Sequence, residues 1–197
     1  MLASKEFDDE KFVNAVLYFA RNTDPESLGP LKLNKLLYYS DFLHFKKYGR
    51  PITNDRYVRM EHGPVPSTSY MIFGQTAGNL GDKPTKTVLS DKVTIKKTLY
   101  KGKVINKIEA LREPDMSVFS DSEIEVLKHV AEVCRSKKLT GSKLRAATHL
   151  PDSPWSRTEE NQTIDYSLIL DNSQDSLSRD YVEYWQKEKE DLSEIFS

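Results

Sequence analysis

The stretch LKLNKLLYYSDFLHFKKY, residues 31–48, decides the fold. Leucines recur in it at positions 33, 36, 37 and 43, which is the spacing of one face of a helix. Gly49 follows where a left-handed C-cap is expected, and Arg50-Pro51 ends the element. The stretch therefore predicts a helix from about Leu31 to Tyr48 that buries a leucine stripe.

Two further helices carry apolar faces that can share a core with it. Asp8 or Asp9 caps a helix that runs to about Asn22. A capping box, Ser120-Asp121-Ser122-Glu123, begins another helix. The apolar stripes are Phe12, Val13, Val16, Leu17 and Ala20 in the first helix and Ile124, Leu127, Val130, Ala131 and Cys134 in the second. We predict one core built by these three helices, with Cys134 as a core thiol.

Strands are predicted in two places. Residues 56–60 have the β-branched and aromatic content of a short strand, followed by a proline-containing turn at 61–66. Pro66 is suited to open a helix through Phe73, and residues 74–81 look like a loop. Apolar and polar residues alternate over 92–99, and a second strand over 104–111 follows a turn that contains Gly102.

These elements predict a mainly α fold with a small antiparallel β-sheet (α+β). We expect a compact helical domain over residues 1–171, with the 92–111 hairpin as an insertion and the 56–60 strand as a possible third member of its sheet. Another helix starts at Thr140 and ends near His149. Residues 172–197 form a C-terminal acidic amphipathic helix, expected to pack on the domain, with a groove in a partner as the alternative. Its stripe contains Leu177, Tyr181, Tyr184, Trp185, Leu192 and Ile195, interrupted by Glu188.

Composition narrows the setting of the protein. Apolar residues make up 38% of the chain and charged residues 30%, which suits a solvated globular domain. The longest apolar run, residues 15–20, is too short to span a bilayer, and no secretory signal is visible at the N-terminus. Because Cys134 is the single cysteine, no internal disulfide can form. These features predict a cytoplasmic protein.

The chain carries no recognisable catalytic or metal-binding motif. Its four histidines are scattered, and neither a nucleophile elbow nor a phosphate-binding loop is present. Asp41 and His44 lie three residues apart and share a helix face, so an enzyme would require them to converge with His62 in one pocket. We expect no such convergence, hence no catalytic residue, no metal and no cofactor.

A basic hairpin makes nucleic acid an alternative ligand. Residues 83–112 hold nine basic and two acidic residues, against three basic and seven acidic in 175–197. Lysines at 92, 96, 101, 103 and 107 could neutralise phosphates along a β-ribbon. Stacking aromatics are nearly absent there, since Tyr100 is the single one, so a solvated basic edge is favoured.

Three blocks of sequence together resemble one known family. They are Lys32 to Asp41 (KLNKLLYYSD), Tyr48 to Ile52 (YGRPI) and His62 to Pro66 (HGPVP), and a weaker fourth block contains Leu139-Thr140, Leu144, His149 and Pro154-Trp155. In order and spacing they resemble the SocA-like antitoxin family, also called the Panacea domain, over about residues 7–171. The family commonly has a bulky residue before its Gly-Pro-Val turn and aliphatic or aromatic residues after it. This chain has Glu61-His62 before the turn and Ser67-Thr68-Ser69 after it.

The resemblance implies an antitoxin of a type II toxin–antitoxin pair, often carried by a prophage or mobile element, that neutralises a cognate protein toxin by direct binding. An alternative within the family is a proteolytic adaptor that delivers the toxin to a Clp-type protease. We expect the toxin to lie on a rigid face built by the 31–48 helix and the 63–66 turn, because prolines there lower the entropy cost of binding. The candidate partner-binding residues are Tyr39, Asp41, His44, His62 and Val65.

Overall fold

The computed structural model describes residues 6–24, 28–78, 84–100, 102–135, 146–171, 173–174 and 176–178. Three predictions fall wholly or partly outside these residues. They are the start of the helix predicted from Thr140, the end of the 74–81 loop, and residues 179–196 of the C-terminal helix.

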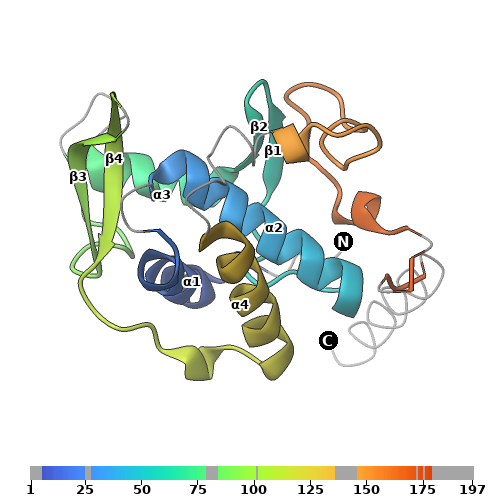
Figure 1. The fold of residues 1–197 in the computed structure, drawn as a ribbon, viewed down its shortest axis with the longest axis horizontal. Helices are drawn as coiled ribbons and strands as arrows, with labels where there is room; N and C mark the ends of the chain where they lie inside the picture. Colours follow the sequence, from blue (N-terminus) through green and yellow to red (C-terminus); the bar gives the residue numbers. More distant parts are fainter. Residues whose placement is uncertain are drawn as a thin grey trace.

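The three helices that the sequence predicts for the core are confirmed. They are α1 (Asp9–Asn22), α2 (Pro30–Tyr48) and α4 (Asp121–Arg135). Asp8 caps α1 by accepting a bond from the Lys11 amide, and Gly49 ends α2 in the left-handed conformation with φ of 70°. α2 crosses the middle of the molecule, with α1 and α4 on one side and the β1–β2 hairpin on the other (Figure 1).

The main core lies where α1, α2 and α4 meet. Large side chains from each helix are fully buried in it, among them Phe12, Phe19, Leu33, Leu36 and Leu127. Cys134 belongs to this core as predicted, and burial raises the pKa of its thiol to about 11. Half of the predicted capping box is present, since Glu123 accepts the Ser120 amide at 2.9 Å, while the Ser120 hydroxyl lies 3.1 Å from that of Ser122.

Residues 63–66 correct the sequence interpretation, because they form a strand and not a turn. β2 (Gly63–Pro66) pairs antiparallel with β1 (Tyr57–Met60), and only Glu61 and His62 lie in the turn. Prolines suggested a turn, but Pro64 and Pro66 alternate along β2, so both can direct their missing amides away from β1, where no ladder bond is lost. α3 (Ser67–Ala77) starts one residue later than predicted, with Pro66 as its N-cap, and it continues over residues 74–77, where the sequence predicted a loop.

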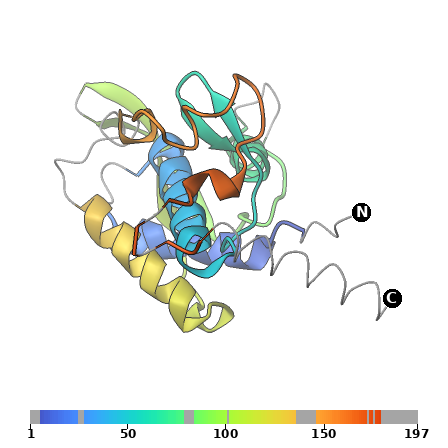
Figure 2. The ribbon, with the colours of Figure 1, turned by 90° about the vertical axis from the view of Figure 1, so that its right-hand side faces the viewer.

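The basic hairpin is confirmed as β3 (Val93–Tyr100) paired with β4 (Lys103–Ala110), and Gly102 has φ of 76° at its turn. It does not share a sheet with β1, which was the expected third member. The reason is local: β1 is already paired with β2, and the two hairpins stand apart (Figures 1 and 2). The hairpin also extends past the core, so Leu99 and Val104 are 72% and 70% exposed.

Residues 146–171 pass along α2 on the side opposite to α1. The Ile164 amide donates to the Tyr57 carbonyl at 2.8 Å, which adds this segment to the outer edge of β1. Tyr38 and Phe42 of α2 pack with Tyr57 and Ile164 in a second, largely aromatic cluster. The fold is thus a compact helical α+β domain, as the sequence predicts, with two small antiparallel sheets in place of the single sheet expected. Among the described helices, none combines the length and the apolar character that crossing a membrane requires.

Candidate functional site

Asp41 of α2 holds the chain that leads into the β1–β2 hairpin. Its fully buried carboxylate accepts the Ile52 and Thr53 amides at 2.8 and 2.7 Å, the Thr53 hydroxyl at 2.6 Å and the Tyr57 hydroxyl at 2.8 Å. Burial raises the pKa of Asp41 to about 6, although these four hydrogen bonds oppose the rise. With its oxygens occupied by protein donors, Asp41 acts as an internal anchor.

His44 lies one turn further along α2 and joins α2 to α4. Its Nδ1 is 2.6 Å from the Arg50 carbonyl oxygen and its Nε2 is 3.1 Å from the Ser122 hydroxyl. Burial lowers the pKa of the imidazole, so the ring is neutral at pH 7. Because a carbonyl only accepts, Nδ1 carries the proton and Nε2 accepts from Ser122. Asp41 and His44 therefore bind different groups and do not form a catalytic pair.

Lys35 presses β2 against α2. This lysine is only 1% exposed, and its ammonium donates to the Pro64 carbonyl at 2.9 Å. The neighbouring Gly63 has φ of 104°, and a Cβ there would meet the Lys35 ammonium and lie 3.0 Å from the Thr148 hydroxyl. Gly63 is thus required twice, for its backbone conformation and for the close approach of α2.

The segment around Trp155 binds the end of the β1–β2 hairpin through hydrogen bonds to its main chain. The Trp155 indole donates to the Met60 carbonyl at 3.0 Å, and His149 Nε2 lies 3.3 Å from the Glu61 carbonyl oxygen. The His149 ring packs on the indole at 3.7 Å between centroids, and the Arg59 guanidinium lies 4.5 Å from its centre. The end of the hairpin is therefore fixed through two main-chain carbonyls, that of Met60 at the end of β1 and that of Glu61 in the turn.

Asp55 secures the return of the hairpin into α3. Its carboxylate accepts the Thr68 and Ser69 amides at 3.0 and 2.8 Å and the Ser69 hydroxyl at 2.6 Å, so it satisfies free donors at the start of α3. Tyr166 donates its hydroxyl to the Asp55 carbonyl at 2.6 Å. The serines and threonine at 67–69 fill the first turn of a helix, as the sequence indicates.

The tip of the hairpin exposes its side chains to solvent, although these contacts hold its backbone. The side chains of Glu61 and His62 are 81% and 62% exposed, with His62 Nδ1 3.7 Å from a Glu61 oxygen, and Met60 is 42% exposed. Val65 is half-buried. We call Met60, Glu61, His62 and Val65 the hairpin platform.

The structure separates the five candidate residues into three groups. His62 and Val65 lie on the hairpin platform, and Tyr39 lines cavities on the outer face of α2. Asp41 and His44 have no exposed surface, so they cannot touch a partner in this structure and instead support the face. They were expected outside because Asp and His are usually exposed, whereas here each finds its hydrogen-bond partners inside.

Sequence reasoning missed Lys35, Asp55 and Trp155 as the residues that hold the platform. Lys35 lies about 200° round the helix from Leu33 at 3.6 residues per turn, so the leucine stripe places it on the opposite, polar face. It is buried because α2 is covered on that face too, and a lysine buried there needs an acceptor. The contacts of Asp55 and Trp155 join residues distant in sequence and have no local signal.

The nucleic-acid alternative gains no support from the described lysines. Lys96 and Lys107 both bind Glu109, at 3.0 and 3.1 Å, and Lys92 donates to the Val88 carbonyl at 2.7 Å. Three of the five lysines proposed to bind phosphates thus have internal partners, while Lys101 and the side chain of Lys103 lie outside the description. No group of three metal-ligating side chains occurs within the described ranges.

A comparison of the sequence with known protein families identifies the family of this chain. The model described as "Antitoxin SocA-like, Panacea domain" matches residues 33–156, which include α2 from Leu33 onward, both hairpins and Trp155 but not α1. No curated protein and no solved structure matches the chain. The matched residues make up more than half of the 197, and on this ground the chain belongs to the SocA-like antitoxin family, with a Panacea domain.

Proposed function

We propose that this protein neutralises a cognate protein toxin, as the antitoxin of a type II pair, by binding it directly through the hairpin platform. Membership of the antitoxin family supports a toxin as the partner in general. The observation that carries the choice of surface is an exposed turn, Glu61-His62, on a hairpin held by hydrogen bonds from three sides.

Rigidity is what makes this turn suited to recognition. Ordering a loop during binding costs free energy, and a surface that is already ordered avoids this cost. Lys35 fixes β2, Trp155 fixes the end of β1, and Asp55 fixes the start of α3. The platform therefore presents an acid, an imidazole and a thioether in one arrangement, which permits both polar and apolar contacts with a toxin.

Co-expression with the product of the neighbouring gene tests the proposal. We expect that product to arrest growth alone, and the pair to restore growth and to elute as one complex in gel filtration. The double variant Glu61→Arg/His62→Asp should lose the complex, because charge and shape change while the bonds to the Glu61 carbonyl remain possible. Glu113→Lys, an equally exposed charge reversal elsewhere, is the matched control.

Two outcomes would contradict the proposal. Absence of both growth rescue and a complex with the wild-type protein would remove the antitoxin function. If the Glu61/His62 variant still formed the complex, the antitoxin function would stand, but the toxin would not bind through the hairpin platform.

The same co-expression strains also test the alternative that this protein delivers the toxin to a Clp-type protease. Neutralisation by occlusion predicts a toxin half-life that does not change when this protein is present, and full rescue in a strain that lacks the protease. Faster loss of toxin that depends on both the protein and the protease would instead establish an adaptor.

A further inference from the structure

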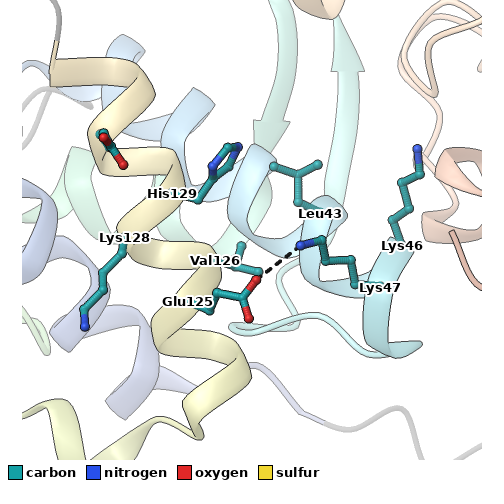
Figure 3. Close-up of a pocket in the computed structure, with 8 residues that line it drawn as sticks. Leu43, Lys46, Lys47, Glu125, Val126, Lys128 and His129 are labelled. Carbon is teal, nitrogen blue, oxygen red and sulfur yellow. Dashed lines mark hydrogen bonds and ion pairs between the residues drawn. The ribbon is translucent and has the colours of Figure 1, made fainter. Parts of the chain in front are cut away.

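The outer face of α2 forms the floor of a groove. Three adjoining cavities of about 490, 250 and 410 Å³ lie along it, and Leu43 lines all three. One wall is α4, from Glu125 to Cys134, and the other consists of residues 147–157 and 168–171. We call this the α2 groove. Figure 3 shows one end of it, where Leu43 and His129 face each other between the helices and Lys47 binds Glu125.

The middle of the α2 groove is almost entirely apolar. Apart from His129, the 250 Å³ cavity is lined by Tyr39, Leu43, Val130, Val133, Cys134 and Ala147. Val133 is 52% exposed, although it continues the apolar face of α4. A cavity of roughly 150 Å³ accommodates benzene, so this one is large enough for the ring system of a tryptophan.

The described chain ends beside this groove. Leu177 packs against Phe45 and Leu170, and its amide donates to the Lys46 carbonyl at 2.9 Å. Lys46 also binds Asp171 at 2.7 Å. The described part of the C-terminal segment is therefore attached at the end of α2, beside Lys46, which lines one end of the α2 groove.

We propose that residues 179–197 bind in the α2 groove of their own chain, with Trp185 in the apolar cavity. In their sequence Tyr181, Tyr184, Trp185, Leu192 and Ile195 recur at the spacing of one helix face. A helix advances about 12 Å over the eight residues from Leu177 to Trp185, and about 10 Å over the seven from Lys46 back to Tyr39. A helix antiparallel to α2 thus brings Trp185 to Tyr39.

Attachment favours the chain's own segment over a second copy. A segment of the same chain binds its site at an effective concentration in the millimolar range. It also avoids the translational entropy that a separate molecule loses on binding. Tyr39, a candidate toxin contact by sequence, then packs against Trp185. The proposal concerns the free protein and does not depend on the hairpin platform.

Fluorine NMR of the full chain tests the proposal, because the protein has two tryptophans, Trp155 and Trp185. With 5-fluorotryptophan, Trp185→Phe assigns the two signals. We expect the Trp185 signal to lie away from that of the free amino acid and to show little solvent isotope shift. Val133→Lys, at an exposed position, should move it to the free value and leave Trp155 unchanged. Leu99→Lys, at an even more exposed apolar position on β3, is the matched control.

Several results would overturn the proposal. They are a solvent-exposed Trp185 signal in the parent protein, burial that disappears on dilution and so reveals a second copy, and burial that appears only when the neighbouring gene's product is added. If Val133→Lys fails to fold, Ala147→Arg blocks the cavity from the opposite, exposed wall. An unchanged Trp185 signal in a folded blocking variant is equally decisive against it.

Discussion

Replacing Gly63 by alanine is the most direct test of how the hairpin is held. Gly63 has φ of 104°, and its new Cβ would meet the buried Lys35 ammonium and stand 3.1 Å from Lys35 Cε. Lys35 cannot yield freely, because its ammonium donates to the Pro64 carbonyl and only 1% of the residue is exposed. The substitution therefore strains the backbone and also displaces a buried cation from its acceptor.

The two effects can be given magnitudes. The left-handed conformation costs a residue with a Cβ about 1–2 kcal/mol, and a lost hydrogen bond to a charged group costs about 1.5–3 kcal/mol. Gly63→Ala should therefore lower the free energy of unfolding by about 2.5–5 kcal/mol. Gly102→Ala is the matched control, since φ is 76° there and no atom lies within 4 Å of the added Cβ. It should cost only the backbone part, about 1–2 kcal/mol.

Urea unfolding followed by circular dichroism measures both variants by linear extrapolation. A second arm adds Lys35→Ala, which empties the space that the new methyl group needs. In that background we expect Gly63→Ala to cost less than in the wild type, with a coupling of about 1–3 kcal/mol. Equal costs for Gly63→Ala and Gly102→Ala, or strictly additive effects of the changes at 63 and 35, would refute the close approach of α2 and β2 as the reason for this glycine.

Three further predictions concern other contacts between distant parts of the chain. Burial raises the pKa of Asp41 from 3.8 to about 6, so its stabilising contribution is full below pH 3.8 and is lost as pH rises through 6. The wild type should lose about 3 kcal/mol relative to Asp41→Asn over this range in urea titrations. Trp155→Phe removes the donor to the Met60 carbonyl and should cost about 1 kcal/mol. Lys11→Met takes the 2.7 Å ammonium partner from Glu123, 2% exposed, and should cost about 2–3 kcal/mol in thermal unfolding.

Each of these predictions has an outcome that contradicts it. A stability difference between wild type and Asp41→Asn that stays constant from pH 4 to pH 7 would mean that this carboxyl does not titrate in that range. If Trp155→Phe were as stable as the wild type, the indole would contribute through apolar packing and not through its hydrogen bond. A Lys11→Met variant as stable as the wild type would show that the Ser120 amide alone satisfies Glu123.

The elements that could be predicted from sequence are those whose cause is local. The stripes of α1, α2 and α4 recur within a few residues, and the alternation of β3 and β4 lies on either side of its own turn. The caps at Asp8 and Gly49 need only their neighbours. Such patterns identify an element without any knowledge of what packs on it.

The parts that could not be predicted depend on partners distant in the chain. β2 is a strand because β1 lies beside it, while its own prolines suggest a turn. His44 is buried because Ser122, 78 residues later, provides a hydrogen-bond partner. Asp41 is buried because the chain from Ile52 to Tyr57 folds back over it. Residue type alone placed both side chains at the surface, and only the tertiary contacts reverse this.

The residues that carry the family resemblance divide into those that hold the hairpin and those that it exposes. Hydrogen bonds join the three blocks that resemble the family, residues 32–41, 48–52 and 62–66. Asp41 of the first block accepts the Ile52 amide of the second, and Lys35 of the first donates to the Pro64 carbonyl of the third. The blocks are thus one buried hydrogen-bonded unit. Glu61 and His62, where this chain departs from the family pattern, lie at the exposed turn and meet the scaffold through a main-chain carbonyl. Because exposed side chains can change at little cost in stability, such a scaffold can keep its fold while the turn adapts to a different partner.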